Sequence, residues 1–322
     1  MAYYLGIDGG GSKTTCAVGD ELSQLATAVA GPSNITRVGE VRARESLHQA
    51  IREACAAAKI APQQVQRVCI GAAGAGRAEV GGIVRTMVAE VIGGEIEVVG
   101  DLQIALEAAF GGGAGVVVIA GTGSAAFGRN AQGKTARAGG WGFAVSDEGS
   151  AHWIARSAVT SVLQAIDQQT DHRKDSQATA AALPLFRELM TAWKLRSLDE
   201  FVRTANSSPD FAALFPAILA AADTGDALAQ RVLSQAGGEL SRLAGMVIRR
   251  LFTGQDASSL AVWLSMAGGV FRYSTRVRDI FRDEVRNVYP QVNVNPQIVE
   301  PVAGALHLAR QGQSRKKVVH TS

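Results

Sequence analysis

The sequence predicts an α/β protein built from two similar domains. Three observations support this prediction. Strand-like and helix-like segments alternate over the first 110 residues, which is typical of an α/β domain. A glycine-rich turn between two strands opens the chain, and the same pattern returns near residue 116. The length, 322 residues, also exceeds the usual size of a single domain.

The first domain, residues 1–112, opens with a strand at 3–8, a turn at Gly9–Gly11 and a returning strand at Thr14–Val18. Hydrophobic spacing predicts the later elements of this domain: a helix at about 40–59, a strand at 65–70, a helix at 80–91, a strand at 95–99 and a helix at 102–110.

The second domain, residues 113–301, repeats the opening with a strand at 116–119, a turn at 121–124 and a strand at 125–129. Residues 151–252 are rich in alanine and have few strand signals, which predicts a helical insertion. The remaining expected elements are a strand at 260–267, a Gly268–Gly269 turn, a helix through 286, an edge strand at 292–294 and a helix at about 302–312 that is a candidate to pack back on the first domain.

Composition narrows the class of protein. The net charge is +3 without a basic, aromatic-rich stripe, so no nucleic-acid partner is expected. Cys16, Cys55 and Cys69 lack C-x-x-C spacing, which favours a reducing compartment over structural zinc. No signal peptide is recognisable, and glycines break the uncharged run at 108–128. A cytoplasmic protein without a membrane partner is therefore expected.

The glycine-rich turns match neither standard nucleotide motif. The first places Ser12 where a P-loop needs lysine, and it precedes a strand instead of a helix. The second, Gly121-x-Gly123, lacks the helix of a dinucleotide site. Each turn alone is equally well explained as a tight hairpin. Two such turns facing each other predict a phosphate site, with Ser12, Lys13 and Thr122 as donors.

Two aspartates follow predicted strands at the end where α/β sheets bind ligands. Asp8 is a candidate Mg²⁺ partner, through water, or else a turn cap. Asp101 is a candidate general base for phosphoryl transfer, or else a helix N-cap.

The motif set resembles a known family. In order it reads Ile7–Thr14, Gly31–Asn34, Gly100–Asp101, Ala120–Ser124, Gly139–Gly142, Ser146–Ser150 and Ala267–Val270. This set resembles the N-acetylglucosamine kinases of the BadF/BadG/BcrA/BcrD ATPase family, within the actin-like ATPase superfamily. The resemblance implies two actin-like, ribonuclease-H-type domains with a ligand cleft between them.

It also implies site residues. The ATP-binding set would be Gly10, Gly11, Ser12, Lys13, Thr14, Gly121, Thr122, Gly123, Ser124, Gly268 and Gly269, with the stretch around Ala213 aligned loosely to an adenine contact. The sugar-binding set would be Asn34, Asp101, Gly140, Trp141, Gly142 and Asp147, although Trp141 is equally well explained as a core aromatic. Glu148 is expected to support the loop.

The function implied is an Mg²⁺-dependent kinase that uses ATP to make N-acetylglucosamine 6-phosphate. Glucosamine and N-acetylmuramic acid stay open as alternative substrates, and the oligomeric state stays open, a homodimer included. An ATPase activator of an acyl-CoA dehydratase or reductase is an alternative of another class, but it needs a cluster-binding cysteine pattern. A non-catalytic sugar sensor is the third class, in which Asp8 or Asp101 would be missing.

Overall fold

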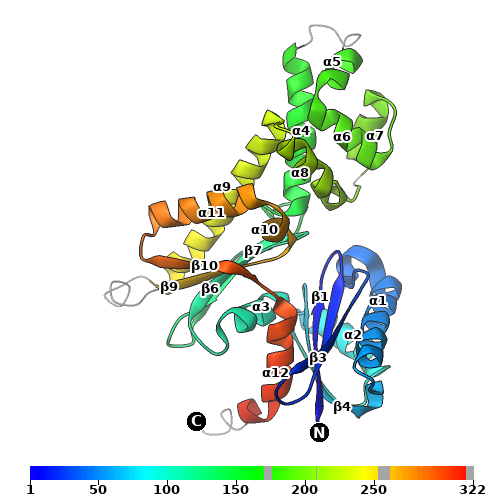
Figure 1. The fold of residues 1–322 in the computed structure, drawn as a ribbon, viewed down its shortest axis with the longest axis vertical. Coiled ribbons are helices and arrows are strands. Elements are labelled where there is room, and N and C mark those ends of the chain that lie inside the picture. Colours follow the sequence, from blue (N-terminus) through cyan, green and yellow to red (C-terminus); the bar gives the residue numbers. More distant parts are fainter. Residues whose placement is uncertain (170–175, 208, 253–261, 317–322) are drawn as a thin grey trace.

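The structure is a computed structural model that describes residues 1–169, 176–207, 209–252 and 262–316. The described part contains two five-stranded sheets, one formed by strands within residues 3–100 and the other by strands within residues 115–299 (Figure 1). Their strand orders are β3-β2-β1-β4-β5 and β10-β9-β6-β7-β8. Read from β8 to β10, the second order repeats the first, with β6 in the place of β1. The predicted α/β fold of two similar domains is therefore confirmed.

The first sheet is built around β1 (Tyr3–Gly9), which is antiparallel to β2 (Thr14–Gly19) and parallel to β4 (Val65–Ala72). β3 (Gln24–Ala30) extends one side and β5 (Glu95–Gly100) the other. Its connections contain α1 (Ile35–Ala57), the 3₁₀ turn η1 (Pro62–Gln64) and α2 (Ala78–Ala89), and α3 (Asp101–Phe110) leads from β5 to the second sheet. Because β1, β4 and β5 are parallel, their carboxyl ends meet at one edge, where polar residues can share a ligand.

The second sheet is built around β6 (Gly115–Ala120), which is antiparallel to β7 (Ser124–Arg129) and parallel to β9 (Val262–Ala267). β8 (Thr135–Gly139) and β10 (Val292–Val299) are its edges, so the predicted edge strand is confirmed. The helices after β9 are α10 (Gly269–Tyr273) and α11 (Thr275–Val288). The predicted beginning of β9 lies outside the described residues.

The expected helical insertion is confirmed and forms the upper part of Figure 1. Its elements are α4 (Ala151–Gln169), α5 (Ser176–Ala182), α6 (Pro184–Trp193), α7 (Leu198–Asn206), η2 (Phe211–Leu214), α8 (Phe215–Asp223) and α9 (Ala227–Leu251). Asp226 caps α9 by accepting from the Ala229 N–H, and it also accepts from the Leu185 N–H at 3.0 Å. One buried carboxylate thus joins α6 to α9, and α9 packs on the second sheet.

Within the described ranges no single helix is long and apolar enough to cross a membrane. The pair formed by η2–α8 and α9 meets the length and composition requirement only together, and it is bent by 117°.

The sequence did not reveal the third strand of either domain. β3 and β8 are sheet edges that carry alanines and exposed polar side chains. Because such strands bury few apolar residues, their period-two signal is weak. The first helix also begins earlier than predicted, at Ile35, and is interrupted at Gly39, whose φ is +76°.

The final helix, α12 (Pro301–Lys316), returns from the second sheet to the first (Figure 1). Two glycines permit its close approach: a Cβ on Gly6 would overlap the backbone of Leu306, and a Cβ on Gly304 would overlap the backbone of Ile104. The buried apolar cluster at this contact consists of Cys69, Ile104, Ala305, Leu308 and Ala309. α12 is therefore an integral layer of the first domain.

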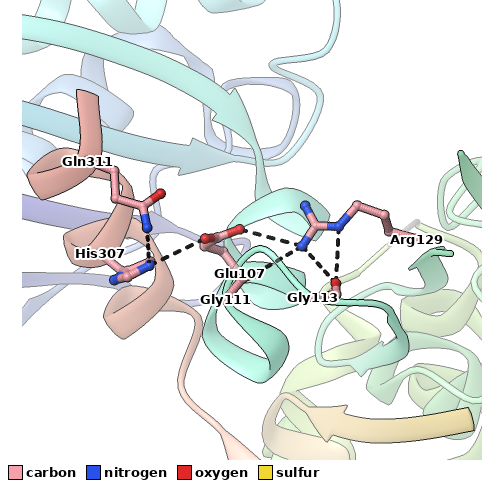
Figure 2. Close-up of polar contacts among 6 residues, drawn as sticks. All are labelled: Glu107, Gly111, Gly113, Arg129, His307 and Gln311. Atoms are coloured by element: carbon pink, nitrogen blue, oxygen red, sulfur yellow. Dashed lines mark hydrogen bonds and ion pairs between the residues drawn. The ribbon is translucent and has the colours of Figure 1, made fainter. Parts of the chain in front are cut away.

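A polar cluster around Glu107 joins the two places where the chain crosses between the sheets (Figure 2). The Glu107 side chain, on α3, is 2% exposed and lies 3.9 Å from Arg129 Nη2 and 3.6 Å from His307 Nε2. Arg129 also donates to the carbonyl oxygens of Gly111 and Gly113, in the segment between α3 and β6. Since His307 is on α12 and Arg129 binds the segment between α3 and β6, these two residues connect the Glu107 carboxylate to both crossings.

Candidate functional site

The first glycine-rich turn joins β1 to β2. Gly9 pairs with Thr14 across the antiparallel strands, so a strand and no helix follows the turn, and the P-loop interpretation is excluded. The turn is closed by the Gly10 N–H, which donates to the Lys13 carbonyl at 3.0 Å. The side chains of Ser12 and Lys13 are exposed at its tip. Both side chains can therefore bind an anion that lies next to the tip of the β1–β2 turn.

Residues behind the turn fix its position. The backbone N–H groups of Ser33 and Asn34 both donate to the Gly10 carbonyl, at 3.1 and 3.2 Å. Thr14 is buried, and its hydroxyl contacts the Gly31 carbonyl at 2.8 Å and Ser33 Oγ at 2.7 Å. The Thr14 side chain is thus turned into the fold, which limits its proposed ATP contact to the backbone.

The second glycine-rich turn joins β6 to β7. The Gly121 N–H donates to the Gly123 carbonyl at 2.9 Å. Ser124 is buried, and its hydroxyl donates to the Glu148 carbonyl at 2.7 Å. Ser124 therefore ties this turn to the loop that follows β8. Of the two hydroxyl side chains in this turn, Thr122 is therefore the one that can bind a ligand at its tip.

The structure brings the two turns together. Ser12 Oγ and Thr122 Oγ1 are hydrogen-bonded at 2.6 Å, although they come from different sheets. A Cβ on Gly11 would lie 3.3 Å from Thr122 Cβ, closer than side chains normally pack, so glycine allows this approach. Hydroxyls and glycine-rich backbone from both sheets thus meet at one point, as a site for a polyphosphate requires.

Carboxylates lie next to the first turn. Asp8, near the end of β1, has its pKa raised to about 7, first by burial and then by Asp101, with Glu300 adding to the effect and Lys13 opposing it. An aspartate that ionises near neutral pH in this setting lacks a compensating cation.

This arrangement fits a magnesium–nucleotide complex. A divalent cation held by ATP phosphates and water would offset the charge that raises the pKa of Asp8. Within the described ranges no group of three or more His, Cys, Asp or Glu side chains could hold a metal directly. The chemistry of the site therefore fits an ion that is bound mostly by phosphate and water.

Asp101 is the first residue of α3, and Gly100 is the N-cap, so the alternative that Asp101 is the helix cap is wrong. Its Oδ1 accepts from the Leu102 N–H at 3.0 Å. Burial raises the pKa of Asp101, while the Leu102 hydrogen bond and the Arg137 charge lower it. The raised pKa makes Asp101 a stronger base than an exposed aspartate.

The loop after β8 has an unusual backbone. Gly139, Gly140, Gly142, Asp147 and Gly149 all have φ between +65° and +105°. The loop also exposes apolar groups: the Trp141 side chain is 81% exposed, so its interpretation as a core aromatic is wrong. An exposed indole on a glycine-rich loop is a typical surface for stacking on a ligand.

Asp147 lies inside this loop and is 7% exposed. Its carboxylate accepts hydrogen bonds from the backbone of Ser124 and Gly142, and burial, the largest effect, raises its pKa. A Cβ on Gly123 would lie 2.8 Å from Asp147 Oδ2. Asp147 thus connects the second turn to the loop. A carboxylate can accept about four hydrogen bonds, so capacity for a sugar hydroxyl remains.

The third glycine turn lies between β9 and α10. Gly268 has a φ of +98°, and a Cβ there would overlap the Ala120 carbonyl, so the fold itself requires this glycine. A Cβ on Gly269 would have only ordinary contact with the Tyr273 ring, at 3.7 Å. Tyr273 is 67% exposed. Gly269 therefore faces open space beside an accessible aromatic ring.

The profile of the BadF/BadG/BcrA/BcrD ATPase family matches residues 5–309. The chain belongs to this family. A curated relative, the N-acetylmuramic acid/N-acetylglucosamine kinase of Clostridium acetobutylicum, is 31% identical over 96% of this chain and 99% of its own length. The N-acetyl-D-glucosamine kinase of Dictyostelium discoideum is 28% identical over 95% of this chain and 97% of its own length.

A crystal structure from Chromobacterium violaceum, provisionally described as an N-acetylglucosamine kinase, shares the fold of this family member. It has a TM-score of 0.69 and 22% sequence identity, and the alignment covers 96% of this chain and 99% of that one. The membership in an ATPase family makes ATP the expected nucleotide of the site.

Two sets of contacts in this family member could not be predicted from its sequence. The Arg137 guanidinium lies 5.9 Å from the Trp141 ring, and an ion pair joins Arg37 on α1 to Asp210 beside η2. No motif contains Arg137, Arg37 or Asp210, because each acts through a neighbour that is distant in sequence or through loop geometry. The stretch around Ala213, loosely aligned to an adenine contact, forms η2 and packs against α4 and α8.

Proposed function

We propose that the protein is a cytoplasmic, ATP-dependent amino-sugar kinase that converts N-acetylglucosamine to its 6-phosphate. The hydrogen bond between Ser12 and Thr122 is the observation that carries the proposal, because it places both glycine-rich turns at one phosphate site. The kinase names of relatives at 31% and 28% identity support the sugar substrate.

In the proposed complex the ATP phosphates lie between the two turns. Ser12, Lys13 and Thr122 would donate to phosphate oxygens, together with the backbone N–H groups of Gly11 and Gly123. Gly10 and Gly121, whose N–H groups close the two turns, would let the phosphates approach the backbone closely. Asp8 would hold Mg²⁺ through water, and the ion would neutralise charge on the phosphates. The Gly268–Gly269 turn would lie beside the nucleoside.

Asp101 is proposed as the general base. It would accept the proton of the sugar hydroxyl as that oxygen forms a bond to the γ-phosphorus and the bond from phosphorus to the ADP oxygen breaks. The sugar keeps the new phosphate, ADP leaves with the bonding electron pair, and Asp101 returns the proton to solvent. Its burial serves this role because it raises the pKa of the carboxylate.

The sugar would lie between the loop after β8 and the edge of the first sheet where β5 ends and Asp101 follows. Asn34, Asp101 and Asp147 offer amide and carboxylate groups to the hydroxyls. Gly140 and Gly142 bring the backbone close to the ring, and the exposed Trp141 can cover its apolar face.

Alternative substrates differ in their charge. N-acetylmuramic acid is the second candidate, since the name of the 31% identical relative includes it. Glucosamine would need an acidic pocket for its ammonium group. For the activator class, Cys16, Cys55 and Cys69 are all buried in the interior of the first domain, whereas a cluster shared between two subunits needs cysteines at a surface, so their placement does not favour such a cluster. Asp8 and Asp101 are both present, which disfavours a non-catalytic sensor.

We expect kcat/KM for N-acetylglucosamine to exceed that for glucose by at least about tenfold, or about 1.4 kcal/mol. An acetamido pocket pairs the amide and buries the methyl, and glucose leaves those groups unmet. Coupled ADP-release assays with N-acetylglucosamine, glucose, glucosamine and N-acetylmuramic acid measure the ratio. A preference for glucosamine would replace the proposed substrate with its deacetylated relative.

Gly269→Val is expected to raise the KM for ATP about tenfold while the sugar KM changes less than about twofold. The fold tolerates a side chain at this position, but a bound nucleoside would collide with it. Steady-state kinetics with each substrate varied in turn measure both constants.

Gly82→Val is the matched control, because a Cβ on Gly82, within α2, meets nothing within 4 Å. An unchanged ATP KM in a folded Gly269→Val protein would contradict the nucleoside assignment.

A further inference from the structure

The loop after β8 needs support from outside its own backbone. Its left-handed residues include four glycines, with Gly139 at the end of β8 counted, and glycine loses more conformational freedom on ordering than any other residue. The loop also carries the proposed sugar contacts, which must be positioned within fractions of an ångström to be effective. A group that fixes the start of the loop would therefore govern sugar binding.

Arg137, two residues before the end of β8, makes such contacts. Its Nε donates to the Gly139 carbonyl at 3.2 Å, and its Nη2 donates to the Gly140 carbonyl. Two adjacent donors on one planar guanidinium thus hold two successive carbonyl groups. The Arg137 backbone is itself fixed, because its carbonyl accepts from Arg250 on α9.

Gly140 and Arg137 fit each other. A Cβ on Gly140 would overlap Arg137 Nη2 and would lie 3.0 Å from Ala125 Cβ. The absence of a side chain at residue 140 therefore leaves the space that the guanidinium fills. The φ of +70° and the close approach to Ala125 favour glycine at this position, and a side chain there would displace the guanidinium from its place.

The same guanidinium faces the proposed ligand groups. Its Cζ lies 5.9 Å from the centre of the Trp141 ring. Its charge also lowers the pKa of both Asp101 and Asp147, which burial raises. Arg137 thus acts on residues from both sides of the proposed sugar site, although no motif contains it.

We propose that Arg137 is a positioning residue for the sugar: its guanidinium fork fixes Gly139 and Gly140 and thereby places Trp141 against the ligand. The inference rests on the proposed function, because it assumes that this loop binds the sugar. Lysine cannot replace arginine in this role, since an ammonium group is a single point with no planar fork.

The test compares Arg137→Met and Arg137→Lys in the full-length protein, with sugar and ATP varied separately. Both variants should raise the sugar KM at least about tenfold and leave the ATP KM within about twofold. Arg286→Met, an exposed change on α11, is the matched control and should change neither constant. A wild-type sugar KM in Arg137→Lys would show that the two-donor guanidinium is not required. Equal changes in the sugar KM and the ATP KM would show that Arg137 does not act specifically on sugar binding.

Two further measurements separate this inference from the proposed function. Acrylamide quenching of Trp141, isolated by comparison with Trp141→Phe proteins, reports the loop without turnover and should change in both Arg137 variants. Gly140→Ala should raise the sugar KM in the wild-type background and add little to Arg137→Met. Additive effects of Gly140→Ala and Arg137→Met on the sugar KM, or unchanged Trp141 quenching in the Arg137 variants, would overturn the inference. A wild-type protein that is inactive on every sugar would instead contradict the proposed function, and the inference with it.

Discussion

Asp101→Asn is expected to lower kcat by about 10²- to 10⁴-fold while sugar binding is partly kept. The amide preserves the shape of the side chain and its position at the start of α3, but it cannot accept the hydroxyl proton. Turnover is measured by ADP release, and sugar binding by ligand-induced change in the unfolding temperature. A variant that keeps more than about a tenth of wild-type turnover would show that Asp101 is not the base.

The pH dependence of the wild-type protein tests the same role. Burial raises the pKa of Asp101 above its ordinary value, and a base must be ionised to act. Activity should therefore fall as the pH drops through this raised pKa, at a higher pH than for an exposed aspartate. Asp223→Asn, an exposed change at the end of α8, is the matched control and should leave kcat and the acid limb unchanged.

Asp8→Asn is expected to lower activity at least about 100-fold and to stabilise the ligand-free protein. The pKa of Asp8 is raised from 3.8 to about 7, so its ionised form opposes folding. Each unit corresponds to about 1.4 kcal/mol, and after allowance for solvent screening we expect a gain of about 1–3 kcal/mol at pH 8. Activity is assayed across Mg²⁺ concentrations, and stability by denaturant unfolding without nucleotide.

The sign of this effect gives it a pH window. A folded-state pKa above the unfolded one favours folding below the unfolded value, and that advantage is lost as the pH rises through the folded value. The gain from Asp8→Asn should thus be largest above about pH 7 and shrink toward pH 4. Asp199→Asn, exposed on α7, should show no such trend. An Asp8→Asn stability gain that is equal at pH 8 and pH 4 would contradict the raised pKa of Asp8.

Much of the fold was predictable because its signals are local. The hairpins β1–β2 and β6–β7 have buried β-branched residues around glycine turns, and both were predicted from the sequence. The edges β3 and β8 bury too little apolar surface to give a comparable pattern.

The candidate site divides in the same way. Asp8 and Asp101 could be selected because each follows a strand at a ligand-binding edge. Arg137 could not, since its importance depends on where the Gly139 and Gly140 carbonyl groups point. The inward orientation of the Thr14 hydroxyl could not be predicted either, because its partners Gly31 and Ser33 become its neighbours only after β3 forms.

The placement of α12 has a consequence for how the protein is made. This helix follows the whole second domain in the chain, yet it covers β1 and β4 of the first. While the chain grows from the ribosome, the surface around Cys69 and Ile104 waits uncovered until the last helix emerges. The first domain to be synthesised is therefore the last to be completed, and a nascent chain halted before α12 presents apolar surface to chaperones.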